Sequence, residues 1–131
     1  MPHPSPVNCV ETRRRRGLVC EQLASDYLQS LGLQILARNL HCRSGELDLV
    51  CLDVDVLVVV EVRQRAGNQF GGALGSVDRR KQRKIIRATQ VYLQRFRQWR
   101  GLTLRFDVLA LTGTQPAGYD IVWIKDAFRA T

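Results

Sequence analysis

Two carboxylates on neighbouring apolar segments are the residues of this chain best placed to do chemistry. Asp48 and Glu61 lie on either side of a short connection at Val54-Asp55, and the two segments predict a β-hairpin. With Val54 and Asp55 as the two-residue connection, the register places Asp48 directly opposite Glu61. Cross-strand partners lie about 4.5–5.5 Å apart at Cβ, and two acids that close repel unless a positive charge lies between them. A divalent cation is the usual partner, and phosphodiester hydrolysis is its usual use.

Three further charged residues fall near this acid pair. Arg63 follows Glu61 on the same face of its strand, and Glu46 shares the face of Asp48 as a candidate additional ligand. Arginine stays protonated at any working pH, so Arg63 can bind phosphate and offset transition-state charge but cannot act as a general base. Glu21 lies on a predicted helix at the edge of its apolar stripe, where a carboxylate needs a partner.

Each of these residues also has an ordinary structural explanation. Asp48 and Arg63 share a face of the hairpin and could form a simple ion pair. Glu61 could be the solvated end of a strand, and Glu21 could cap its helix or pair with the arginines at 13–16. General acid–base catalysis contributes about 10²–10⁴-fold, so an arginine at position 63 indicates either a slow enzyme or a protein that only binds. Lys81 or Lys84 could reach in from the predicted helix, but no pattern in the sequence selects either of them.

The positive charge of the chain is concentrated rather than spread. The formal net charge is +8, and ten basic residues with no acid lie between Arg79 and Phe106. Such patches attract the phosphate backbone of nucleic acids, whereas solvated helix faces normally mix both signs. An anionic membrane fits less well, because the basic helix has no strongly apolar face beyond what a core needs. The predicted nucleic-acid-binding residues are Arg65, Arg79, Arg80, Lys81, Arg83, Lys84 and Arg87.

Length and composition indicate one ordinary globular domain. The chain has 131 residues, which is enough for a substantial core but too few for two domains. No apolar run reaches the roughly 18–20 residues that span a bilayer, and the proline-rich start lacks the apolar stretch of a signal peptide. We therefore expect a cytoplasmic protein without a membrane partner. Residues 1–13 are predicted to be a disordered lead-in, and residues 14–131 a single domain.

Other cofactor sites are not indicated by the sequence. The cysteines at 9, 20, 42 and 51 lack the paired spacing of a zinc site, and Cys20 and Cys51 fit small buried hydrophobic positions. The segment Gln64–Gly75 holds four glycines but lacks the lysine-serine ending of a phosphate-binding loop. We expect no small-molecule cofactor.

Hydrophobic periodicity predicts two long helices and five strands. The helices cover about 14–31 and 77–99, the second capped by Ser76, and the strands cover about 33–38, 45–52, 56–63, 102–111 and 119–124. Both hairpin strands are apolar on both faces, as central strands covered by helices on each side tend to be. The predicted fold class is an α/β sandwich with a central mixed five-stranded β-sheet flanked by helices.

A series of short motifs runs through nearly the whole chain, from about Gly17 to Phe128. They are Glu21-x-x-Ala24-x-x-Tyr27-Leu28, Gly32-x-x-Ile35-Leu36-x-Arg38-Asn39, Gly45-Glu46-Leu47-Asp48-Leu49, Val60-Glu61-Val62-Arg63-x-Arg65, Phe70-Gly71, the 77–93 helix, Arg105-Phe106-Asp107-Val108 and Ala127-Phe128. Together these motifs resemble the bacterial YraN family of uncharacterised proteins. The order of helix glutamate, strand aspartate and Glu-x-Arg also resembles the PD-(D/E)-x-K nuclease superfamily, especially archaeal Holliday-junction resolvases.

The resemblance implies a restriction-endonuclease-like core and a nucleic-acid role. By position, Glu21, Asp48 and Glu61 fall on the acidic metal-binding positions of the superfamily, and Arg63 falls where the superfamily has its lysine. These four residues would form the catalytic site of an endonuclease that uses Mg²⁺ or Mn²⁺ and acts on DNA, although the residues themselves do not distinguish DNA from RNA. Resolvase-like relatives commonly act as dimers, so the resemblance also implies a homodimer. Two alternatives stay open: a nucleic-acid-binding module with impaired catalysis, and a protein-interaction module with a basic face.

Overall fold

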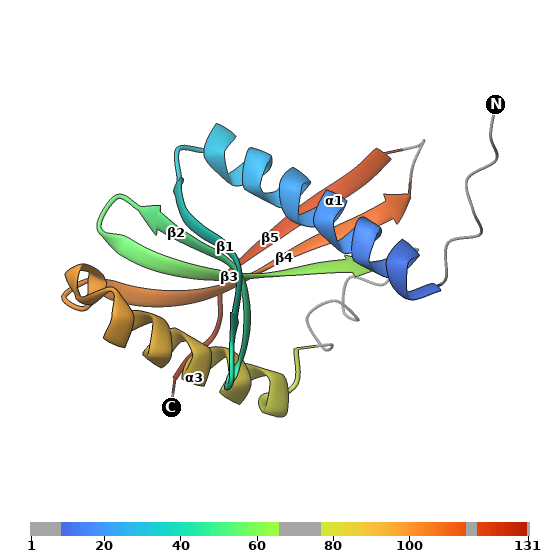
Figure 1. Ribbon diagram of the computed structural model, residues 1–131. Coiled ribbons are helices and arrows are strands. Elements are labelled where there is room, and N and C mark those ends of the chain that lie inside the picture. Colours follow the sequence, from blue (N-terminus) through green and yellow to red (C-terminus); the bar gives the residue numbers. More distant parts are fainter. Residues whose placement is uncertain (1–8, 66–76, 115–117, 131) are drawn as a thin grey trace.

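A twisted sheet of five strands lies between two long helices, one across each face (Figure 1). This computed structural model describes residues 9–65, 77–114 and 118–130. The elements are α1 (Cys9–Ser30), β1 (Gln34–Cys42), β2 (Gly45–Asp53), β3 (Val56–Arg65), α3 (Arg79–Arg95), a short 3-10 helix (Arg97–Trp99), β4 (Thr103–Thr114) and β5 (Gly118–Phe128). The predicted α/β sandwich with a mixed five-stranded sheet is confirmed.

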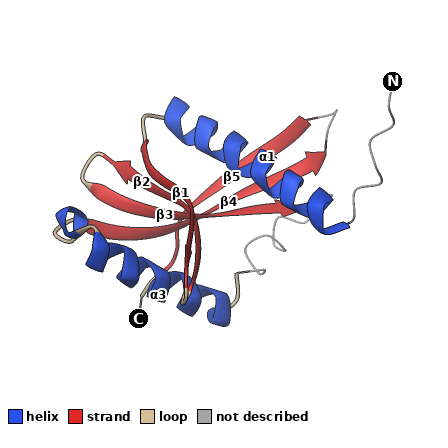
Figure 2. Ribbon diagram, viewed as in Figure 1, coloured by secondary structure: helices blue, strands red, loops and turns tan. Residues whose placement is uncertain are grey.

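The strands follow one another across the sheet in chain order, β1-β2-β3-β4-β5. β3 and β4 run parallel, and the other neighbouring pairs are antiparallel. A parallel pair needs a crossover connection, and α3 lies in that connection, on the opposite face from α1 (Figure 2). Within the described ranges, no helix is both long and apolar enough to cross a membrane.

The β2–β3 hairpin has the predicted register. Residues 49–53 pair with residues 56–60 without a shift, so the connection is the predicted two-residue turn. Val54 in that turn has φ +57°, the left-handed conformation that tight hairpin turns of this length favour. Continuing the same register by one position brings Asp48 opposite Glu61.

Several elements extend beyond their predicted ends. Helix α1 begins at Cys9, so residues 9–13 of the predicted disordered lead-in are helical, whereas residues 1–8 lie outside the described ranges. The division into a lead-in and one domain otherwise stays a prediction. β1 runs to Cys42 and β5 to Phe128, because their pairing with β2 and β4 continues past the apolar segments that were visible in the sequence.

Helix α3 is shorter than predicted at both ends. Its N-cap is Asp78, whose Oδ1 accepts the backbone N–H of Lys81 at 2.8 Å. The predicted cap, Ser76, is therefore wrong and lies outside the described ranges. Aspartate caps as well as serine does, and its charge also favours the positive end of the helix dipole. The helix ends at Arg95, and Arg97–Trp99 form a separate 3-10 turn.

The described cysteines behave as small hydrophobic residues. Cys20 and Cys51 are buried and not in a disulfide. Of the predicted glycine-rich loop Gln64–Gly75, the first two residues belong to β3 and the rest lies outside the described ranges.

Each face of the sheet carries its own hydrophobic core. Along β3, Leu57 and Val59 pack with residues of α3. The alternate residues Val58 and Val60 pack with residues of α1. Since side chains alternate along a strand, Glu61 follows on the α3 side at the end of this apolar run.

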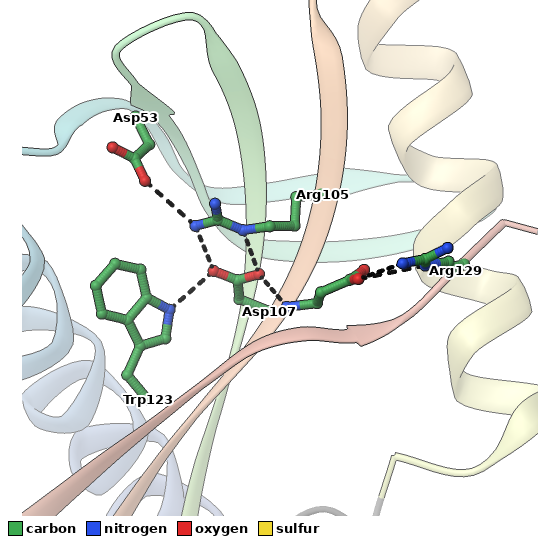
Figure 3. A network of polar contacts seen from close by, with 6 residues as sticks. Asp53, Arg105, Asp107, Trp123 and Arg129 are labelled. Carbon is green, nitrogen blue, oxygen red and sulfur yellow. Dashed lines mark hydrogen bonds and ion pairs between the residues drawn. The ribbon is translucent and has the colours of Figure 1, made fainter.

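A buried aspartate ties β4 to β5 at a break in their ladder. The register of the two strands shifts between Phe106 and Val108, and the residue at that point, Asp107, is 0 % exposed. Its carboxylate accepts hydrogen bonds of 2.8–3.0 Å from the Arg105 guanidinium, the Trp123 indole and the backbone N–H of Asp126 (Figure 3). Both oxygens of this carboxylate therefore accept hydrogen bonds from groups within the fold.

Candidate metal and phosphate site

Asp48 and Glu61 meet where β2 leaves its regular pairing with β3. Glu61 is 4 % exposed, so the interpretation of Glu61 as a solvated strand end is wrong. Asp48 is partly buried, and its Oδ2 accepts the backbone N–H of Val62 on β3 at 2.9 Å. The charge of Asp48 raises the pKa of Glu61, so the two carboxyl groups lie close together. The hairpin register behind the prediction is confirmed as far as Leu49 and Val60, and the roles predicted for the two acids stay predictions.

The backbone around Asp48 explains how its side chain reaches β3. Leu47 packs with the core beneath α3, but Leu49, two residues later, packs with the core beneath α1. Residues two apart normally share a face, so β2 turns over at Asp48. On its other side, the register of β1 places Asn39 opposite Asp48, and Asn39 has a left-handed φ of +50°. Asp48 therefore lies beside a residue of unusual backbone conformation on β1, and just past the last pair of the β2–β3 ladder its carboxylate accepts the Val62 N–H.

Two cations from different elements contact the same oxygen of Glu61. Arg63 Nη2 lies 3.4 Å from Glu61 Oε1, and Lys81 Nζ lies 3.5 Å from the same atom. Arg63 shares the face of Glu61 on β3, whereas Lys81 comes from the first turn of α3. Among the described residues, Arg63 pairs with Glu61 and not with Asp48, so the simple ion pair considered from the sequence is not formed.

The inward position of Lys81 has a signal in the sequence that the grouping by charge missed. The prediction places Lys81 with the phosphate-binding residues of the helix surface. Ile85, about one turn later, and Tyr92, about three turns later, are both buried on α3. These spacings return to the same helix face. A lysine in line with an apolar stripe needs an acidic partner, and here that partner is Glu61.

Burial raises the pKa of both acids, and the charge of Asp48 adds to the rise at Glu61. The pKa of Glu61 rises to about 7, first because its carboxyl group is buried and second because the charge of Asp48 lies beside it; Lys81 and Arg63 oppose this rise. The pKa of Asp48 is also raised, mainly by burial, although the Val62 N–H favours its ionised form. The two cations therefore compensate the pair only in part. A further positive charge beside the pair would favour the ionised form of both acids.

Asp48 and Glu61 fit a hard divalent cation. Mg²⁺ is commonly bound by one or two carboxylates, with water and phosphate oxygens completing its shell. The under-compensated pair supplies that donor set. Within the described residues, however, no group of three His, Cys, Asp or Glu side chains converges closely enough to hold a metal. The predicted ligand set of Asp48, Glu61 and Glu21 is therefore not assembled as a single cluster.

Glu21 and Glu46 lie apart from the acid pair. The pKa of Glu21, on α1, is raised first by burial and then by the charge of Asp48, so its carboxyl group senses the pair. Its Oε2 is buried without a hydrogen-bond partner in the described part of the chain, which is typical of an atom that meets water or an ion. Glu46 is exposed, and its Oε1 lies 3.1 Å from His41 Nδ1.

Five of the predicted nucleic-acid-binding residues form an exposed surface, which we call the α3 basic face. They are Arg79, Arg80, Arg83, Lys84 and Arg87. No acid in the described ranges forms an ion pair with any of them. The side chain of Arg65 lies outside the described part of the structure. The α3 basic face therefore holds its charge free for an external anion, on the same helix that carries Lys81.

Comparison with known sequences identifies the family of this chain. The sequence profile of the Uncharacterised protein family UPF0102 matches residues 20–111. The chain belongs to this family. A UPF0102 protein of Pseudomonas putida KT2440 is 50% identical over 115 residues, covering 88% of this chain and 93% of the relative. A UPF0102 protein of Pseudomonas putida GB-1 is 48% identical over 129 residues, covering 98% and 99%. One of Stutzerimonas stutzeri A1501 is 50% identical over 114 residues, covering 87% and 94%.

The UPF0102 match contains the whole candidate site. Glu21, Asp48, Glu61, Arg63 and Lys81 all fall between residues 20 and 111. The match confirms the YraN-like family resemblance read from the motifs. The wider link to PD-(D/E)-x-K nucleases stays a prediction.

Proposed function

We propose that this UPF0102 protein binds nucleic acid and hydrolyses phosphodiester bonds as an endonuclease that uses Mg²⁺ or Mn²⁺. The observation that carries the proposal is the buried Asp48–Glu61 pair, in which two adjacent acids are short of positive charge. Such an arrangement costs stability, and costs of this kind are typical of sites kept for chemistry. The order of the motifs, which resembles that of PD-(D/E)-x-K nucleases, supports the same conclusion.

Asp48 and Glu61 would hold the cation. When bound, a divalent metal offsets the charge of the pentacovalent phosphate and lowers the pKa of a bound water. The hydrogen bond from the Val62 N–H fixes Asp48 Oδ2, so one carboxylate is oriented before any ligand arrives. Glu21, whose buried Oε2 has no partner among the described residues, would orient a water from the α1 side.

Arg63 and the α3 basic face would bind the phosphates. Arg63 lies beside Glu61, so its guanidinium would contact the scissile phosphate through paired hydrogen bonds. The α3 basic face would bind the neighbouring backbone phosphates and make affinity fall steeply with salt. We take DNA as the polymer because of the likeness to Holliday-junction resolvases.

A cleavage and binding panel tests this function. Linear, single-stranded and four-way-junction substrates, as DNA and as RNA, are titrated with Mg²⁺ and Mn²⁺. We expect metal-dependent nicking that Asp48→Asn abolishes, while Asp55→Asn, the same change at an exposed position of the same hairpin, leaves it intact. Activity that survives Asp48→Asn would come from a contaminating nuclease. Absence of any binding at low salt would overturn the proposal and favour the protein-interaction module.

Arg63 favours a second candidate, a nucleic-acid-binding module that has lost catalysis. An arginine cannot take up the water's proton as a lysine of depressed pKa can. The single change Arg63→Lys separates the two candidates. Cutting that appears only in this variant indicates an enzyme disabled at one position, whereas salt-dependent binding without rescue indicates a binding module. Sedimentation with and without the four-way junction tests the predicted homodimer.

A further inference from the structure

Lys81 occupies a position that a purely surface-binding lysine would not. It lies on the inward face of α3, in line with the buried Ile85 and Tyr92, and its Nζ is 3.5 Å from Glu61 Oε1. The backbone of Lys81 is fixed, because its N–H donates to the Asp78 cap at 2.8 Å. The lysine therefore reaches the acid pair from a helix, while β3 presents an arginine.

Of the two cations on Glu61 Oε1, Lys81 is the one that can leave. Its side chain is 35% exposed, against 27% for Arg63. A lysine carries a compact charge on a flexible four-carbon stem, whereas the guanidinium of arginine is planar and donates in fixed directions. Arg63 Nε is also buried, so the inner part of this guanidinium is enclosed by the protein.

We propose that Lys81 takes the place of a divalent cation on Glu61 and supplies from helix α3 the lysine that strand β3 lacks at position 63. This inference rests on the proposed function and assigns one more residue to the same site. The ammonium group and a metal ion compete for this carboxylate oxygen, because Arg63 already contacts it and a third positive charge there would be repelled by the other two. Once released from Glu61, the ammonium group is available to a phosphate oxygen of the substrate.

A purely structural role for Lys81 predicts a different behaviour. If the ion pair only anchored α3 to the sheet, its removal would weaken the fold and leave metal affinity unchanged or lower. Competition predicts the reverse sign: removal of Lys81 makes the metal bind more tightly. The sign of the change in metal affinity therefore distinguishes the two roles without any measurement of catalysis.

The decisive experiment measures binding of Mn²⁺ alone, by calorimetry and by the electron paramagnetic resonance signal of free Mn²⁺. We compare the unmodified protein with Lys81→Met and with the matched control Lys84→Met, which removes the same charge from an exposed position of the same helix. We expect Lys81→Met to bind Mn²⁺ about 5–150-fold more tightly, the usual range for coupled sites. Lys84→Met should change the affinity by less than about twofold, since solvent screens exposed charges.

Equal or weaker Mn²⁺ binding by Lys81→Met, or no binding by either protein, would overturn the proposal. Thermal unfolding of each variant shows that the comparison is made on folded protein. Cleavage assays add an independent reading: Lys81→Met should lower kcat, and Arg63→Lys in the same chain should restore it. Tighter Mn²⁺ binding with no cleavage by any variant would refute the proposed endonuclease while keeping the competition. Cleavage together with an unchanged Mn²⁺ affinity in Lys81→Met would refute the competition and keep the proposed endonuclease.

Discussion

Two aspartates of this protein, Asp107 fully buried and Asp48 partly buried, lie in similar backbone settings and have opposite surroundings. Asp107 lies at a register shift between β4 and β5, and Asp48 lies where β2 turns over between β1 and β3. Each accepts a backbone N–H from the neighbouring strand, Asp126 to Asp107 and Val62 to Asp48, both at 2.9 Å. In both places a carboxylate accepts a backbone N–H that the regular pairing of the strands leaves without a carbonyl partner.

The partners of the two aspartates differ. Asp107 also receives hydrogen bonds from a guanidinium and an indole, so its charge is matched inside the fold (Figure 3). Asp48 has a second acid, Glu61, beside it, and the nearest cations contact that acid only at 3.4 and 3.5 Å. A matched buried carboxylate stabilises the fold, whereas an unmatched one is a charge held ready for a ligand.

The largest effect is expected from breaking the matched aspartate. Asp107→Asn removes the charge that the Arg105 guanidinium and the backbone N–H of Asp126 surround, and leaves the partly buried Arg105 without its main partner. Removing one member of a buried pair costs about 3–5 kcal/mol. Urea unfolding should show a loss of this size, with Mn²⁺ affinity of the remaining folded protein unchanged. A loss below about 1 kcal/mol would show that the network is not the stabilising element inferred here.

Breaking the unmatched aspartate should affect activity and spare the fold. Asp48→Asn removes one charge of a repelling pair, so the free energy of unfolding should stay the same or rise. Loss of a metal ligand should bring phosphodiester cleavage down to background, a reduction of at least about 10²–10³-fold, because metal catalysis is worth several kcal/mol. Cleavage kinetics and urea unfolding on the same samples check both halves. A variant that is both inactive and strongly destabilised would place Asp48 in the same class as Asp107.

The pH dependence of stability sharpens the comparison at Glu61. Its ordinary pKa is 4.5 and its folded pKa is about 7, so the folded state holds the proton more tightly than the unfolded chain. The stability this contributes is complete below about pH 4.5 and is lost as the pH rises through 7. Between pH 5 and 8 the free energy of unfolding of the unmodified protein should therefore fall by roughly 2–3 kcal/mol relative to that of Glu61→Gln, whose side chain stays neutral. The free energy of unfolding of both proteins is measured by urea unfolding at each pH. If it changes with pH by the same amount in both, the raised pKa of Glu61 is refuted.

The smallest effects are expected on the α3 basic face. Arg83→Gln and Arg87→Gln should each weaken DNA binding by less than about tenfold and lower the slope of log affinity against log salt by about 1. Arg129→Gln is the control, because Arg129 is exposed but already pairs with Asp126 at 2.8 Å. Binding measured across a salt series gives both quantities. Equal slopes in all three variants would exclude the α3 basic face as the phosphate-binding surface.

Much of the fold could be predicted because it depends on local periodicity. The hairpin register follows from the two-residue turn and from apolar residues on both flanking strands, and both were visible at Val54 and Asp55. The boundaries were less predictable. The α3 cap is Asp78 and not Ser76, because either short polar side chain can accept a helix N–H and only the backbone path selects one.

The candidate site divides in the same way. The sequence by itself determined that Asp48 and Glu61 face each other, because that arrangement depends only on one turn and one strand register. Only the tertiary structure decided that Lys81 reaches Glu61, that Glu21 stands apart from a single metal cluster, and that Asp107 is fully matched. These three features depend on the placement of α3 against β3, of α1 against β2, and of β4 against β5. They depend on how helices lie across a twisted sheet, a property set by the packing of both cores and not by any single segment.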